Sequence, residues 1–225
     1  GNDTDGLFDI SIYPLVKLWG FTTEKYHVPD KAERDAVIKK IDYKKIELLP
    51  NCQVQIPSGM AIDLGAAAKG YLSQKIIDLC KEKKVTSCIL SLGGNVQTIG
   101  MKPDDTEYTV GITDPSDGSS IYGTVKVKDK AVITSGIYQR NFKKDGKLYH
   151  HIMDKRTGMP ADNNLASVTV IAENGAMADA SATALSVMGE EKAIAFQKKH
   201  PQIQIILIRK DGTFYQSEKA GMIKS

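Results

Sequence analysis

The chain has 225 residues, of which 41% are hydrophobic and 25% charged, an ordinary balance for a globular protein with a sizeable core. Its formal net charge of +3 is too small to indicate nucleic-acid or membrane binding, and the sequence has no basic cluster with interleaved aromatic residues. No apolar stretch is long enough to span a bilayer. We therefore expect a globular protein with no nucleic-acid partner.

The first predicted elements are short. Pro14–Trp19 is predicted to form a helix with Pro14 in its first turn, and Lys31–Lys40 a polar helix with Asp30 as its N-cap. Ile46–Ile56 is predicted to form two short strands around a turn at Pro50-Asn51.

The longest helical pattern covers Leu64–Lys83, where Leu72, Ile76, Leu79 and Cys80 follow the 3.6-residue period. Cys88–Leu92 follows as a predicted buried strand, in which we interpret Cys88 as a core residue. The three cysteines of the chain include no C-x-x-C pair, so a thiolate zinc site is not expected.

The second half of the chain is predicted to contain more strands than helices. The expected strands are Tyr108–Thr113, Thr124–Val127, Ala131–Thr134, Val168–Ala172, Ile203–Ile208 and Thr213–Gln216, and the expected helices are Ala176–Met188 and Lys192–Lys199. Hairpin turns are expected at Lys143–Lys147 and Asp211-Gly212. Strand pairs joined by tight turns favour an α+β fold with mixed or largely antiparallel sheets. No repeat or long linker divides the chain, so one domain is expected over residues 1–225.

Asp179 and Thr183 stand four residues apart in the small-residue run Ala178–Leu185. On a helix their oxygens project from one face, one turn apart, and the small neighbours let another surface come close. Two hard oxygen ligands in such a place suit Mg²⁺. An Asp and a Thr at this spacing are also commonly a solvated pair or a local hydrogen bond, so the motif does not settle the question alone.

The run Gly65–Gly70, with Lys69 in it, opens the longest helix. A helix N-terminus offers free N–H groups and a partial positive charge, and a lysine beside it suits an anionic group such as a pyrophosphate. Close helix packing through the alanines is the alternative. The order of residues is not that of a Walker loop.

Two further motifs stand at strand ends. Gly93-Gly94, before Asn95, allows close backbone approach to a ligand or forms a simple tight turn, and it lacks the dinucleotide-fold fingerprint. His150 and His151 are adjacent, so in a strand they point to opposite faces and a metal clamp from this pair is not expected. One of them is placed to donate a hydrogen bond or transfer a proton, and a structural role is the alternative. Thr134-Ser135-Gly136 supplies hydroxyls but no nucleophile elbow.

Taken in order, these motifs resemble the ApbE-type flavin transferases, also called thiamine biosynthesis lipoproteins, over nearly the whole chain. The matching segments are Gly6–Asp9, Pro14–Phe21, Asp63–Tyr71, Gly93–Asn95, Thr134–Gly136, His150–Asp154 with Thr157-Gly158, and Ala178–Ala180 with Thr183-Ala184. The resemblance implies a Mg²⁺-dependent enzyme that binds FAD, transfers FMN to a threonine hydroxyl of an acceptor flavoprotein and releases AMP. Hydrolysis of FAD to FMN and AMP, and a non-catalytic flavin-binding or scaffold domain, are the alternative functions.

The resemblance also implies roles for single residues. Asp179, Thr183 and the main-chain carbonyl of Ala66 are the expected metal ligands. The expected FAD contacts are Leu7, Phe8, Asp9, Asp63 and Lys69, with His151 and Ile152 near the flavin nucleotide. A weakly acidic hydroxyl nucleophile benefits from a base, for which Asp179 and His151 are both candidates.

Members of this family usually carry a further N-terminal segment with a lipoprotein signal, and residues 1–6 lack the basic start and apolar core of a signal peptide. The expectation is therefore an N-terminally short chain of a protein of the cell envelope, anchored to the membrane in its full-length form. An uncovered sheet edge would favour a homo-oligomer.

Overall fold

The computed structural model describes all 225 residues and divides the chain into two compact units. Unit 1 consists of residues 1–64 and 140–162, and unit 2 of residues 65–139 and 163–225. The single domain expected over residues 1–225 stays a prediction. None of the helices combines the length and the apolar composition needed to cross a bilayer.

Unit 2 is built on a six-stranded sheet with the strand order β14-β13-β12-β7-β4-β3, in which every neighbouring pair is antiparallel. The strands are β3 (Cys88–Leu92), β4 (Asn95–Ile99), β7 (Ala131–Gly136), β12 (Leu165–Ala172), β13 (Gln204–Arg209) and β14 (Phe214–Gln216). All residues of β12 are buried, because this central strand is covered on both faces.

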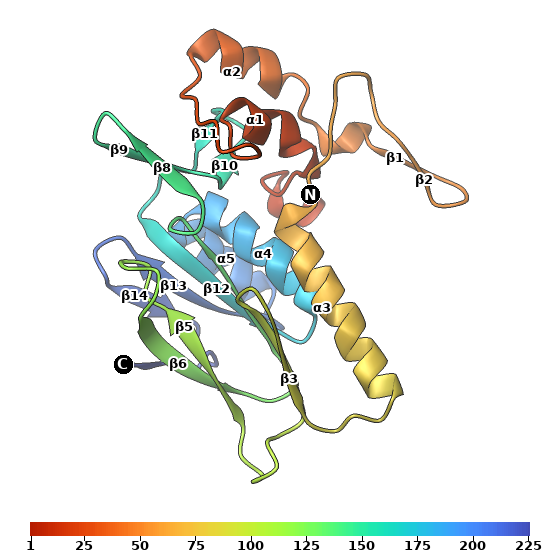
Figure 1. The fold of residues 1–225 in the computed structure, drawn as a ribbon, viewed down its shortest axis with the longest axis vertical. Helices are drawn as coiled ribbons and strands as arrows, with labels where there is room; N and C mark the ends of the chain where they lie inside the picture. The colour runs from red at the N-terminus through yellow and green to blue at the C-terminus, as the bar shows by residue number, and fades with distance from the viewer. The chain divides into compact units, whose positions relative to one another are not determined.

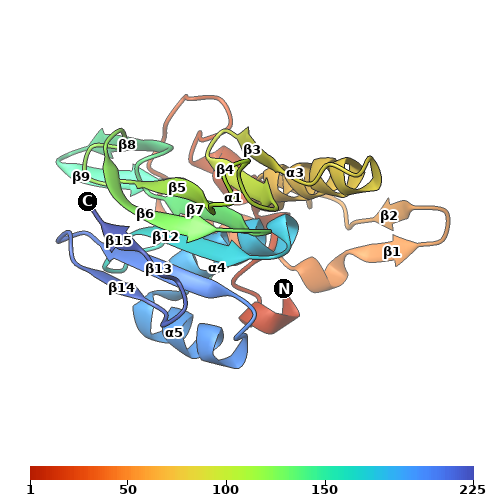
Figure 2. The ribbon, with the colours of Figure 1, turned by 90° about the horizontal axis from the view of Figure 1, so that it is seen from below.

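Two different layers cover that sheet (Figures 1 and 2). The helices α3 (Gly65–Glu82), α4 (Gly175–Met188) and α5 (Glu190–Lys199) lie on one face, and a three-stranded sheet of β5 (Tyr108–Thr113), β6 (Ile121–Val127) and β15 (Ile223–Lys224) on the other. Successive residues of β12 therefore enter different cores: Val170 packs under the helices, and Ile171 packs under the smaller sheet. The α+β class with antiparallel sheets is confirmed.

The apolar positions that predicted α3 are not its buried face. The buried residues of the helix are Gly70, Ser73 and Ile77, whereas Leu72 and Leu79 are 55% and 52% exposed. Gly70 and Ser73 are inside because α3 packs closely against α4, which leaves no room there for larger side chains. At these two positions burial follows from the neighbouring helix and not from hydrophobicity.

The prediction of a buried strand at Cys88–Leu92 was right in its bounds and wrong in its burial. β3 is the edge strand of the sheet and pairs only with β4, so Ile89 is 50% exposed. Cys88 is half-buried and not a core residue. A run of apolar residues does not distinguish an edge strand from a central one, because pairing on the second side depends on segments distant in sequence.

Unit 1 combines two short α-helices and three 3-10 turns (Asn2–Thr4, Ile10–Ile12 and Tyr43–Lys45) with three hairpins. The helices are α1 (Tyr13–Leu18) and α2 (Lys31–Ile38), and the strand pairs are β1 (Glu47–Leu49) with β2 (Gln53–Gln55), β8 (Asn141–Lys144) with β9 (Lys147–His150), and β10 (Met153–Asp154) with β11 (Met159–Pro160). Its core is aromatic: Trp19 and Phe21 pack with Phe142, and Trp19 Nε1 donates to the Gly158 carbonyl at 2.9 Å.

The local signals for these elements were reliable. Asp30 caps α2, and it forms a capping box with Glu33 that fixes the start of the helix. Pro14 lies in the first turn of α1 as predicted. The sequence showed no signal for β4, β10, β11 or β15, which are short or rich in polar residues.

Candidate active site

The helices α3 and α4 of unit 2 are in close contact at Gly70 and Gly175. A Cβ added at Gly70 would lie 2.3 Å from the Gly175 carbonyl oxygen and 2.5 Å from the Asp179 Cβ. A Cβ added at Gly175 would lie 1.7 Å from Gln97 Nε2. The contact between the helices therefore requires glycine at position 70, whereas a side chain at position 175 would strike Gln97 of β4. The contact at Gly70 brings the Asp179 carboxylate against the backbone of α3.

Asp179 is held by a main-chain group of α3. The Gly70 N–H donates to its Oδ2 at 2.8 Å, and this bond is buried. Gly70 follows Ala66 by four residues, so this bond holds the Asp179 carboxylate against the first turns of α3.

Thr183 lies one turn after Asp179 on α4, and its hydroxyl contacts a hydroxyl from a strand of the sheet. Thr183 Oγ1 and Ser135 Oγ are 3.2 Å apart, with Ser135 on β7. The Thr134-Ser135-Gly136 motif therefore serves to place a hydroxyl beside Thr183. Sequence reasoning noticed these hydroxyls but did not connect Ser135 with Thr183.

A buried polar network supports the α3 side of this contact. Gln97 Nε2 donates to Ser73 Oγ at 2.6 Å, and Ser73 Oγ lies 3.1 Å from both the Gly70 carbonyl oxygen and Asn95 Oδ1. All three side chains are buried. Asn95 and Gln97 of β4 hold Ser73 of α3, and Ser73 holds the Gly70 carbonyl, so the network fixes the backbone that holds Asp179. Nothing in the sequence marked Ser73 or Gln97.

The electrostatics of Asp179 follow from its burial. Desolvation raises the pKa of the Asp179 carboxyl above its ordinary value, although the Gly70 N–H and the charge of Lys69 act to lower it. A carboxylate with one hydrogen bond and little water is poorly compensated. A cation beside it would supply the missing compensation.

Lys69 and the glycine pair stand next to this carboxylate in unit 2. Lys69 is exposed, and its Nζ lies 3.5 Å from the Gly93 carbonyl oxygen. Gly93 and Gly94 have φ of 56° and 86°, and a Cβ at either would meet nothing within 4 Å. The turn is therefore open, and its glycines are required by backbone conformation rather than by packing.

In unit 2 the charge of Lys69 acts on Asp179, Thr183 follows Asp179 by one turn of α4, and Ala66 lies on α3 four residues before Gly70. The predicted metal ligands are the Asp179 carboxylate, the Thr183 hydroxyl and the Ala66 carbonyl oxygen. All three are hard oxygen ligands of the kind that Mg²⁺ prefers. No group of three or more His, Cys, Asp or Glu side chains is placed to hold a metal ion. The residues present fit a magnesium ion that keeps several of its waters and binds a phosphate, and they do not form an all-protein metal cage.

The other predicted ligand contacts belong to unit 1, where Asp9 is already fully engaged. Asp9 Oδ1 accepts from the N–H and the hydroxyl of Ser11, and Oδ2 accepts from the Tyr43 N–H and from Lys155 Nζ, the last at 2.6 Å. Burial raises the pKa of Asp9, but the bonds from Lys155 and Ser11 outweigh it, and the net pKa lies below the ordinary value. These contacts favour a structural role for Asp9.

The remaining unit 1 residues vary in exposure. Leu7, Phe8 and Asp63 are half-buried, and Ile152 is buried. His151 lies directly after β9, where its Nδ1 is 3.2 Å from the Arg140 carbonyl oxygen. A carbonyl only accepts, so this hydrogen bond requires the proton to be on Nδ1. The contacts of these five unit 1 residues with a ligand stay predictions.

Comparison with known proteins places the whole arrangement in one family. A sequence model of the ApbE family matches residues 1–207. The chain is 37% identical over 210 residues to an FAD:protein FMN transferase of Klebsiella pneumoniae and 36% identical over 222 residues to one of Treponema pallidum, in each case over 92% of this chain. It spans 65% and 61% of the lengths of these two relatives.

Solved structures agree with the sequence relatives. The crystal structure of an ApbE protein from Thermotoga maritima superposes with a TM-score of 0.88 at 34% identity, covering 96% of this chain and 71% of that one. The flavin transferase ApbE from Vibrio cholerae gives a TM-score of 0.83 at 31% identity, with the same coverage of 96% and 71%.

Proposed function

The chain belongs to the ApbE family, and from that premise we propose that it supplies the metal and pyrophosphate site of an FAD:protein FMN transferase. The proposed reaction moves FMN from FAD to a threonine hydroxyl of an acceptor protein. The threonine oxygen bonds to the FMN phosphorus, the bond from that phosphorus to the bridging oxygen breaks, and AMP leaves with the bridging oxygen. The hydroxyl proton passes to a base.

One observation in the structure carries this proposal: the Gly70 N–H of α3 donates to the Asp179 carboxylate of α4 in a buried hydrogen bond. This bond holds the carboxylate against the first turns of α3, and the Thr183 hydroxyl follows one turn further along α4. We propose that Asp179, Thr183 and Ala66 hold Mg²⁺. The ion would neutralise charge on the pyrophosphate as the bridging bond breaks.

The chain's own groups contribute in three ways. Lys69 and the first N–H groups of α3 place positive charge where a diphosphate would lie. The open Gly93-Gly94 turn leaves room for a ligand against the backbone. Asp179 is better suited to binding a cation than to accepting a proton, and His151 of unit 1 stays the other candidate base.

The test uses the 225-residue chain with FAD, Mg²⁺ and an acceptor domain that a family member flavinylates. We expect the acceptor to gain the mass of FMN and AMP to appear in equal amount. Replacing the target threonine of the acceptor by alanine, or adding a chelator, should prevent both. Release of AMP and free FMN without modification of the acceptor would show hydrolysis of FAD. If no AMP is released and the acceptor gains no mass, this chain is not a catalyst of the proposed reaction.

A variant pair separates the metal site from general damage. Asp179→Ala should lower Mg²⁺ affinity, measured by calorimetry without FAD, by more than about 100-fold, with turnover lost in parallel. Asp78→Ala removes an exposed carboxylate from α3 and should leave both unchanged. Unchanged Mg²⁺ affinity in Asp179→Ala would remove this residue from the site.

The resemblance to membrane-anchored lipoproteins leads us to propose the cell envelope as the location of the full-length protein. The homo-oligomer is likewise a proposal, supported by the unpaired outer side of β3.

A further inference from the structure

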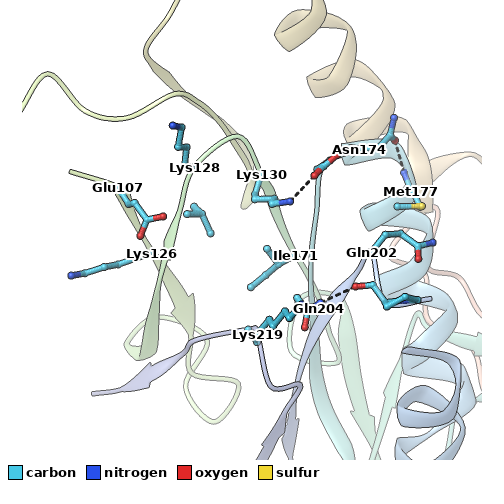
Figure 3. A pocket seen from close by; sticks show the side chains of 14 residues that line it. Glu107, Lys126, Lys128, Lys130, Ile171, Asn174, Met177, Gln202, Gln204 and Lys219 are labelled. Atoms are coloured by element: carbon cyan, nitrogen blue, oxygen red, sulfur yellow. Dashed lines mark hydrogen bonds and ion pairs between the residues drawn. The ribbon is translucent and has the colours of Figure 1, made fainter. Parts of the chain in front are cut away.

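A cavity of about 530 Å³ opens in unit 2 on a side of the fold that the proposed reaction does not use (Figure 3). Its walls come from β6 and the loop that follows it, from the turn between β12 and α4, and from the connection between α5 and β13. None of Ala66, Lys69, Asp179 or Thr183 lines it. We call this cavity the lysine groove.

The charge around the lysine groove is predominantly positive. Four lysines and two glutamates line it: Lys126, Lys128, Lys130, Lys219, Glu107 and Glu173. Lys130 Nζ is paired with Glu173 Oε1 at 2.9 Å, and this hydrogen bond lowers the pKa of the Glu173 carboxyl. The lining keeps an excess of positive charge, because lysines outnumber glutamates.

Beneath the charged rim the groove has an apolar floor. Val127, Ile171 and Ala220 line it, and each is buried within the core between the two sheets. Met177, on the first turn of α4, adds a partly exposed apolar side chain. A ligand that fits this surface therefore has apolar groups as well as negative charge.

The lysines do not converge on one point. In Figure 3 the amino ends of Lys126 and Lys128 point outwards from the cavity, whereas Lys130 reaches across to the β12–α4 turn. A small anion such as phosphate is bound by donors that converge on it. Positive charges spread along a rim suit several carboxylates spaced along a chain, with apolar side chains between them.

We propose that the lysine groove binds an acidic, extended segment of a protein partner, with apolar side chains on the floor and carboxylates at the lysine rim. Met177 and Asp179 are two residues apart on α4 and so point to different sides of the helix. A segment in the groove would therefore not compete with a ligand of Asp179. The proposal does not depend on the flavin transfer.

The experiment measures binding of two labelled octapeptides by fluorescence anisotropy. One alternates glutamate with valine and the other alternates lysine with valine, so the apolar residues are the same. We expect the intact chain to bind the glutamate peptide only, with an affinity that falls as salt is added. Equal binding of the two peptides, or no binding of the glutamate peptide, would overturn the proposal.

A pair of double variants locates the binding. Lys126→Glu with Lys128→Glu should weaken binding of the glutamate peptide about tenfold, whereas Lys143→Glu with Lys144→Glu, exposed lysines of unit 1 with the same change in net charge, should keep it within about twofold. Equal loss in both would show a net-charge effect and refute the groove. Displacement of the peptide by equimolar inorganic pyrophosphate would refute an extended ligand and indicate a small-anion site.

Discussion

Asp9 in unit 1 and Asp179 in unit 2 are buried to the same extent, each with a residue exposure of 6%, and yet their surroundings are opposite. Asp9 accepts four hydrogen bonds, one of them from a lysine. Asp179 accepts one, from a backbone N–H. The pKa of Asp9 is lowered in the fold and that of Asp179 is raised.

The difference shows that burial alone does not indicate whether a carboxylate can bind a ligand. A carboxylate whose acceptor sites are all filled by the protein stabilises the fold and has no capacity left for a ligand. A carboxylate with one partner carries an unfavourable desolvation that a cation can relieve. Both aspartates were predicted to bind ligands, and the count of their partners separates them where the motif did not.

The largest effect on the free energy of unfolding is expected at Asp9. Asp9→Asn leaves the charge of Lys155 without its partner and should destabilise unit 1 by about 3 kcal/mol at pH 7. Urea unfolding followed by the fluorescence of Trp19, the single tryptophan, reports on this unit because Trp19 is fully buried in its core.

The pH dependence of that effect has a defined sign. Because the folded pKa of Asp9 lies below the reference value of 3.8, its contribution is present above that pH and is lost as the pH falls through the folded pKa. The difference in the free energy of unfolding between wild type and Asp9→Asn should therefore become smaller in acid. A gap that stays constant down to about pH 2.5 would show that the carboxylate charge is not involved.

The second effect tests the contact that holds Asp179. An alanine in place of a helical glycine usually stabilises by about 0.5–1 kcal/mol. At Gly70 we expect the opposite, a loss of about 2 kcal/mol, because the Cβ would strike the Gly175 carbonyl. Hydrogen exchange of the amides of α3 and α4 measures this loss of stability in unit 2. A stabilised Gly70→Ala would mean that the helices separate easily and that the close crossing is not needed.

The smallest effect is expected at Asp179 itself when no metal is added. Asp179→Asn keeps an oxygen for the Gly70 N–H and removes a poorly compensated charge, so the free energy of unfolding should change by less than about 1 kcal/mol. Because the folded pKa is raised, any advantage of the variant should be greatest at neutral pH and disappear below the reference value of 3.8. A destabilisation as large as that of Asp9→Asn would make both aspartates structural.

The sequence by itself determined the local elements. The order of its motifs also determined the family. Asp30 with Glu33 started α2, Asp145-Gly146 turned a hairpin through two positive φ values, and the helical period marked α3 within one residue of each end. Such signals act within a few residues of the chain, where backbone conformation and capping bonds are decided. Lys69, Asp179 and Thr183 were marked by their places in the predicted helices, whereas the role of Ala66 came from the resemblance to the family.

Only the tertiary structure decided which side chains are buried and which polar groups are satisfied. Leu72 is exposed while Ser73 is buried, because α4 lies against the small-residue face of α3. Gln97 and Ser135 join the site from strands that are distant in sequence. Hydrogen-bond partners depend on three-dimensional neighbours, so the contrast between the filled carboxylate of Asp9 and the underfilled one of Asp179 is a property of the fold and not of the motif.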